Sequence, residues 1–140
     1  MRPGTHTRSR HQRGQALLET ALMIIVIFMV VFFVFELGWL MYTYSVLADA
    51  ANEGVRYAIV HSGAGDADGT TKARVKAFAT TSMHSVSDTN PSIAVTAPDG
   101  NYTPPNRVRV TVTYIYIPFL PKFITAPTMH AYAEGRMVAQ

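Results

Sequence analysis

Cysteine is absent from this chain of 140 residues, so disulfide bonds, thiolate nucleophiles and cysteine-bound zinc are excluded. Charge is also scarce. Charged residues make up 15% of the chain, against 49% that are hydrophobic, and this balance is typical of a protein that contacts lipid. The length suits one domain of ordinary size, and without disulfides that domain depends on packing and hydrogen bonds.

Acidic residues are missing from residues 1–14, which carry four of the arginines. The rest of the chain then holds eight basic and nine acidic residues and is nearly neutral. The net charge of +3 therefore belongs to the N-terminal segment, and a nucleic-acid-binding surface is not predicted. Residues 1–14 also have no apolar face, so we expect a basic, polar leader that is disordered in isolation.

Groupings that support catalysis or metal binding are also missing. The sequence shows no Ser/His/Asp grouping and no phosphate-binding glycine loop, and its five histidines have no ligand spacing. Asp66, Asp68 and Gly69 resemble the start of a calcium loop, but the twelfth position is Ala77 where a bidentate Glu is required. We therefore predict no enzyme activity, no metal and no cofactor.

A long apolar run is what the sequence has in abundance. From residue 16 to residue 35 the only charge is Glu19, and about 20 residues rising about 1.5 Å each cross a hydrocarbon core of about 30 Å. We expect a transmembrane helix over residues 15–37, because a lone span in lipid must be helical. The preceding arginines predict a cytoplasmic N-terminus and an extracytoplasmic remainder.

The helix is predicted to continue over residues 38–60 as an amphipathic extension. Apolar residues recur there every three or four positions, with a polar set on the opposite side. The apolar set is Leu40, Tyr44, Leu47, Ala51, Val55 and Ala58, and the polar set is Ser45, Asp49, Asn52, Glu53 and Arg56. Glycine-rich sequence after Val60 predicts a loop.

Residues 61–140 are predicted to form an extracytoplasmic α+β domain. It contains a helix near residues 71–83 and strands near 93–97, 107–117 and 129–138. The strand at 107–117 has the clearest pattern, with Val and Tyr alternating with Arg and Thr. We expect a small antiparallel sheet to pack on the apolar stripe of the long helix, since neither part buries enough surface alone.

The junction between leader and helix is the most informative motif. Gly14 ends the leader, and Glu19 is the fifth residue after it. A cut between Gly14 and Gln15 would remove the basic segment, keep the helix, and create an amino group four residues from a carboxylate. A buried carboxylate costs about 2.5–3.5 kcal/mol in a membrane span. In a bundle of subunits the new ammonium of a neighbour offsets that cost and sets axial register. Alternatively, Glu19 lies at headgroup level, paired with Arg13 or water.

Further along the helix, each conspicuous residue has two readings. Glu36 is either a headgroup-level carboxylate or an interhelical contact. Glu53 and Arg56, at i and i+3, form either a weak exposed pair or a brace for the sheet edge. Gly54 either permits close packing or is merely tolerated.

Together these features resemble a class III prepilin signal and the TadE-like family of tight-adherence (Tad) pilus proteins. The resemblance covers about residues 13–60. It is carried by the Gly14–Glu19 junction and by two later segments. These are Glu36 with Gly38, and Ala50, Ala51, Glu53, Gly54, Arg56, Tyr57 and Ala58.

The resemblance implies a pilin-like fold and a minor pilin or pseudopilin in the bacterial inner membrane. Its implied partners are other pilin subunits, a prepilin peptidase, the inner-membrane assembly platform and the lipid bilayer. Gly14 and Gln15 would form the processing site, and Glu19 the assembly carboxylate. Two rivals stay open, a major filament-forming pilin and an unprocessed, membrane-anchored binding domain.

Overall fold

The computed structural model describes residues 8–61, 69–83, 86–87, 89–119 and 125–138, with side chains from residue 14 onward. The chain divides into two compact units, Met1–Gly38 and Trp39–Gln140. Helix α1 (Arg8–His61) contributes residues to both. The helix begins six residues before Gly14, so the described part of the predicted leader is helical rather than disordered. Helical geometry satisfies backbone groups locally, and Gly14 alone does not interrupt it.

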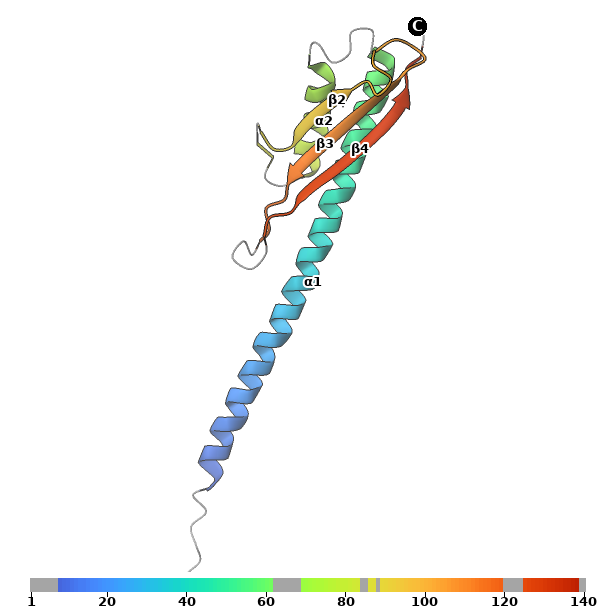
Figure 1. Cartoon of the computed structure of the whole chain (residues 1–140). Helices are drawn as coiled ribbons and strands as arrows, with labels where there is room; N and C mark the ends of the chain where they lie inside the picture. Colours follow the sequence, from blue (N-terminus) through green and yellow to red (C-terminus); the bar gives the residue numbers. More distant parts are fainter. Residues whose placement is uncertain (1–7, 62–68, 84–85, 88, 120–124, 139–140) are drawn as a thin grey trace, which may run out of the picture. The chain divides into compact units, whose positions relative to one another are not determined.

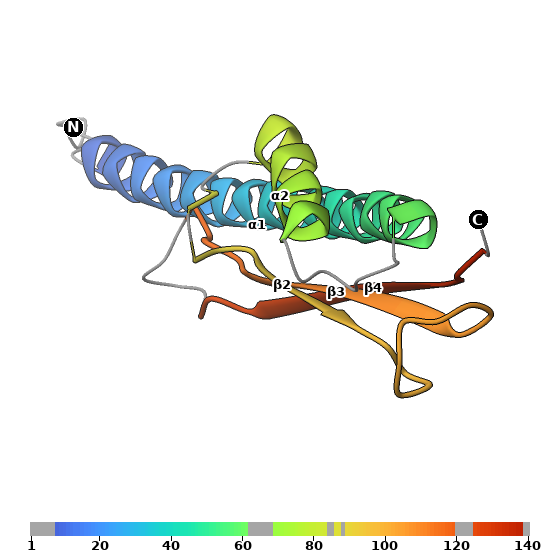
Figure 2. The same cartoon turned by 90° about the horizontal axis from the view of Figure 1, so that it is seen from above.

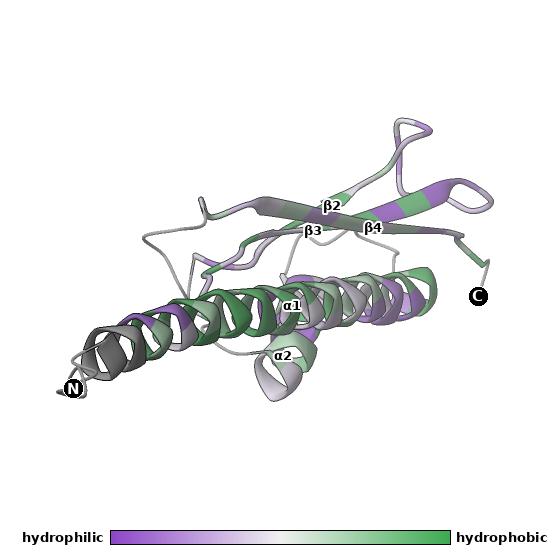
Figure 3. Cartoon of the chain, turned by 90° about the horizontal axis from the view of Figure 1, so that it is seen from below, coloured by the Kyte–Doolittle hydropathy of each residue, from purple (hydrophilic) through white to green (hydrophobic). Residues whose placement is uncertain are grey.

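The first unit is the N-terminal stretch of α1. From residue 14 to Phe35 every side chain is exposed, although most are large and apolar. The ribbon of α1 is hydrophobic over the middle of the helix and mixes hydrophilic with hydrophobic residues toward its C-terminal end (Figure 3). In the part of the chain that the structure describes, α1 is the one helix long and apolar enough to cross a membrane. An exposed apolar surface of this length is stable in lipid rather than in water.

The second unit combines the C-terminal stretch of α1, a short helix and a sheet (Figure 1). Helix α2 (Thr70–Ser82) begins after Gly69, which has the positive φ of 73° that glycine tolerates. The strands are β2 (Ser92–Thr96), β3 (Arg107–Ile115) and β4 (Thr128–Arg136). They pair antiparallel in the order β2-β3-β4. The predicted α+β fold with a second short helix and a small antiparallel sheet is therefore confirmed.

One face of the sheet packs against α1, and both helices lie on that side (Figure 2). The valines of β3 at 108, 110 and 112 are fully buried, as their alternation predicts. From α1, the main core cluster takes Leu47, Ala50, Ala51 and Val55. Tyr44, expected in the apolar stripe, is 51% exposed. The buried stripe is instead centred on small residues, which let the helix backbone approach the sheet.

Both ends of β3 extend beyond β2, and side chains complete the pairing there. The β2–β3 register runs only from Ser92↔Thr113 to Thr96↔Arg109. The amide of Asn90 donates to the carbonyl of Ile115 and accepts from its N–H, both at 2.9 Å. At the other end, Asp99 Oδ2 accepts from the N–H of Arg107 at 2.8 Å. These side chains replace the missing strand, so β3 keeps its backbone bonds without a longer partner.

Candidate functional site

The three residues of the predicted junction lie on the exposed surface of α1. Gly14, Gln15 and Glu19 are all exposed. A methyl group at Gly14 would meet nothing within 4 Å. Near them, the Thr20 hydroxyl donates to the carbonyl of Ala16 at 2.8 Å, a bond within one helical turn. Within the described residues, the Glu19 carboxylate makes no hydrogen bond or ion pair, and the side chains near it along the helix are exposed leucines and a methionine.

Glu36 and Gly38 differ in exposure. Glu36 is 5% exposed, one of three buried polar residues of the described chain. Gly38 is exposed, and a methyl group there would meet nothing within 4 Å. Both readings of Glu36 stay open.

Within the second unit, Glu53 pairs with a residue that the sequence analysis did not single out. Its Oε1 accepts from Nε and Nη2 of Arg74 on α2, at 3.4 and 3.3 Å. The expected partner Arg56, one turn along α1, is exposed. Glu53 therefore links the two helices rather than forming a pair along α1 or bracing the sheet edge. The pair is partly exposed, so its contribution to stability is about 1 kcal/mol or less.

Gly54 lies where α1, α2 and β3 meet. A Cβ there would lie under 3.0 Å from Cγ2 of Val75 and 3.1 Å from Cγ1 of Val110. Both valines are fully buried. Of the two readings of Gly54, the structure supports close packing. Tyr57 stacks on His61 further along α1, with ring centroids 4.1 Å apart.

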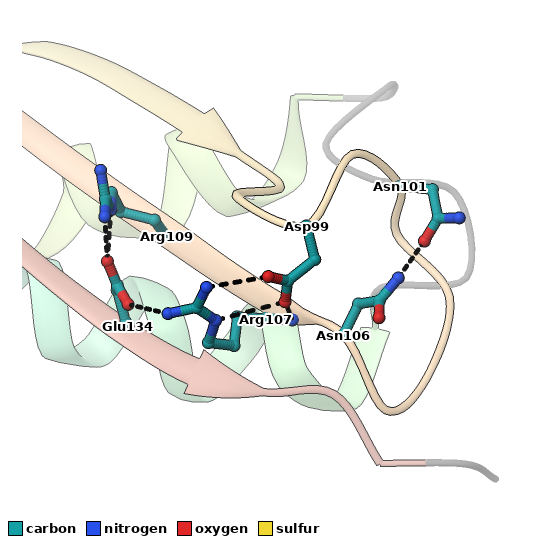
Figure 4. A network of polar contacts seen from close by, with 6 residues as sticks. All are labelled: Asp99, Asn101, Asn106, Arg107, Arg109 and Glu134. Carbon is teal, nitrogen blue, oxygen red and sulfur yellow. Dashed lines mark hydrogen bonds and ion pairs between the residues drawn. The ribbon is translucent and has the colours of Figure 1, made fainter.

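A polar network on the open face of the sheet was missed by the sequence analysis (Figure 4). Arg107 bonds to both carboxylate oxygens of Asp99, at 2.8 and 3.2 Å, and its other arm lies 3.5 Å from Glu134. Glu134 also pairs with Arg109, whose guanidinium lies 5.5 Å from the ring centre of Tyr132. Because the network joins residues up to 27 positions apart, only the strand register reveals it.

The network changes the acidity of its members. The side-chain hydrogen bond from Arg107, followed by the backbone bond from that residue, lowers the pKa of Asp99 to about 2. The same side-chain bond raises the pKa of Arg107. Elsewhere, burial raises the pKa of Tyr114. The bond between Arg107 and Asp99 favours the charged forms of both groups, and the contacts of Arg107 form a polar brace that links the β2–β3 connection to β4.

The residues that the structure describes contain no group of three or more His, Asp or Glu side chains that could hold a metal ion. The Asp66–Asp68 sequence considered as a calcium loop lies outside the described residues.

One comparison with known protein families gives a match, and the matched residues lie in α1. Residues 14–56 match the family described as TadE-like protein. This segment is TadE-like. The TadE-like match begins at Gly14, ends at Arg56 and lies wholly within α1. It confirms the family resemblance read from the sequence over this range. No curated protein and no solved structure matches the chain.

The TadE-like family is a structural component of tight-adherence pili. Over residues 14–56 the match indicates a relation to pilus-associated proteins, which interact with other pilus components, and the helix that carries it is long and apolar enough to cross a membrane. The match includes Glu19, Glu36, Gly38, Glu53 and Gly54 but stops one residue before Tyr57.

Proposed function

We propose that this chain is a minor pilin or pseudopilin, a structural subunit that is held by residues 15–37 in the bacterial inner membrane and later docks into or beneath a Tad-type filament. The observation that carries the proposal is the placement of Glu19. It is the one charged residue in the apolar run, it is exposed on α1, and it lies five residues after Gly14 in the TadE-like segment.

In this proposal the leader, 1–14, is cytoplasmic and residues 39–140 lie outside the membrane. A prepilin peptidase cuts between Gly14 and Gln15. The bond lies inside α1, so the peptidase requires local unwinding of the helix. Gly14 favours that unwinding, because glycine is about 1 kcal/mol less favourable than alanine in a helix.

After the cut, Glu19 meets the new ammonium of Gln15 on a neighbouring subunit. The pair offsets the cost of an unpaired carboxylate in hydrocarbon, which is about 2.5–3.5 kcal/mol. The cost of desolvating both charges offsets much of their attraction. The pair therefore sets the axial register of the subunits more than it raises their affinity for one another. The partners in this step are other pilin subunits and the inner-membrane assembly platform.

Two measurements test the proposal. Mass spectrometry of the protein from cells should give a mature N-terminus at Gln15, and Gly14→Ala should leave the uncut chain, although the added methyl meets nothing in the fold. A protein that keeps its first 14 residues in a piliated strain would instead indicate an anchored binding domain. Glu19→Gln, which keeps shape and removes charge, should insert normally but assemble poorly. Thr20→Ala, the adjacent polar position, is the matched control. Equal piliation by both variants would remove the register role.

A further inference from the structure

The exposed face of β3 changes character along its length. At the Arg107 end its outward residues are Arg and Thr. At the other end the exposed positions are Ile115, the last residue of β3, and then Ile117 and Phe119 in the segment that follows the strand. Each of these three is more than half exposed, at 53%, 55% and 55%, while Tyr116 and Pro118 between them are buried. Large apolar side chains exposed together mark an interaction surface. The polar brace of Arg107 and Glu134 lies toward the opposite end of the strand.

The apolar end of β3 lies beside the residue at which α1 enters the second unit. The ring of Phe119 contacts Trp39 edge-on, with centroids 5.7 Å apart. Trp39 also packs on Tyr42, at 5.5 Å. β3 ends and β4 begins at the end of the unit that α1 enters (Figure 1). The surface formed by Trp39, Tyr42, Ile117 and Phe119 is hereafter the basal surface.

Chain connectivity and the Trp39–Phe119 contact keep the basal surface close to the end of the apolar stretch of α1. Trp39 directly follows the apolar stretch that ends the first unit at Gly38. Phe119 is within 5.7 Å of the Trp39 ring, and Ile117, two residues away, is at most about 7 Å further. The interfacial layer on each side of the hydrocarbon core is roughly 5–8 Å thick. Aromatic side chains are enriched in that layer.

We propose that the basal surface is a second membrane contact, by which the β3 end of the second unit, hereafter the head domain, rests in the interfacial layer of the bilayer that α1 crosses. The inference rests on the proposed membrane span. Lipid is the favoured occupant because Trp39 directly follows the exposed apolar stretch of α1 in the sequence and the side chains that form the surface are aromatic and aliphatic. The contact holds the sheet at a defined tilt before assembly, with the charged brace directed away from lipid.

A single-tryptophan series in the full chain tests this contact, because Trp39 is the one tryptophan in the sequence. In a Trp39→Phe background, tryptophan is placed singly by Phe119→Trp or Ile117→Trp. Phe28→Trp reports the centre of the span, and Tyr132→Trp reports the open face of the sheet, where the native side chain is 69% exposed. Each variant is reconstituted in phosphatidylcholine vesicles with brominated acyl chains.

We expect brominated lipid to quench Phe119→Trp and Ile117→Trp nearly as much as native Trp39, and about double or more the quenching of Tyr132→Trp. Quenching at Phe28→Trp with none at either β3-end position would overturn the basal contact while leaving the span intact. No quenching at Phe28→Trp would overturn the span and the basal contact together. Shielding of the β3-end tryptophans from aqueous acrylamide without lipid quenching would assign the surface to a protein partner and also overturn the proposal.

Discussion

Adding one methyl group at Gly54 should destabilise the head domain, because three elements meet at that position. The Cβ of Gly54→Ala would lie under 3.0 Å from Cγ2 of Val75 and 3.1 Å from Cγ1 of Val110. Both side chains are β-branched and fully buried, so neither has a flexible end that can move aside. Overpacking of this kind costs about 1–3 kcal/mol. Alanine also has a higher helix propensity than glycine, which offsets about 1 kcal/mol of this loss in the free energy of unfolding.

The expected net loss is therefore up to about 2 kcal/mol, which lowers the unfolding temperature of a domain of about 100 residues by roughly 4–8 °C per kcal/mol. Near-ultraviolet circular dichroism of the detergent-solubilised chain follows the loss, since the buried Tyr114 and Tyr116 report the head domain and not the apolar helix.

Two comparisons decide whether the reasoning holds. Gly38→Ala adds the same methyl to the same helix in open space, and it should leave the unfolding temperature unchanged or raise it slightly. Val75→Ala makes room beside Gly54, so Gly54→Ala should cost less in that background than alone, a coupling of about 1–3 kcal/mol. If Gly54→Ala unfolds at the wild-type temperature, or if Val75→Ala fails to relieve it, close packing is not the reason for glycine at this position.

Two further predictions concern the side chains that complete β3. Asn90→Ala removes both hydrogen bonds to the backbone of Ile115 and should lower the free energy of unfolding by about 1–3 kcal/mol. Denaturant titration measures this change, and an unchanged midpoint would show that water replaces the amide fully. Because the pKa of Asp99 is lowered to about 2, its ion pair should stabilise the fold above pH about 4 and lose that effect as pH falls towards 2. Asp99→Asn should flatten the stability profile in that window, and parallel profiles for both proteins would contradict the assignment.

The long helix and the buried strand could be predicted from the sequence because their signals are local. The apolar run after Gly14 and the Val/Tyr alternation of residues 108–116 each follow the period of one element. The exposure of Tyr44 could not be predicted, since its place in the helical repeat matches that of buried neighbours. Which part of an apolar stripe is buried depends on where the sheet ends, and the repeat carries no such information.

The candidate site divides in the same way. The Gly14–Glu19 junction could be recognised from the sequence because it is defined by the number of residues between a glycine and a carboxylate in one helix. The contact of Glu53 with Arg74 could not be predicted, because i, i+3 neighbours are judged within one helix whereas Arg74 lies on another. Likewise, Asn90 and Asp99 read as loop residues until the register shows that β3 extends beyond β2 at both ends.

The sequence alone therefore determined the elements of this protein and the placement of a single carboxylate in its apolar helix, since both depend on the period and spacing of residues within about 20 positions. Only the tertiary structure decided which side chains meet. The Arg107–Glu134 contact joins residues 27 positions apart, and the contact of Trp39 with Phe119 links the start of the head domain to the segment that follows its central strand. Such pairs arise from the packing of separate elements, and no local pattern of residues encodes them.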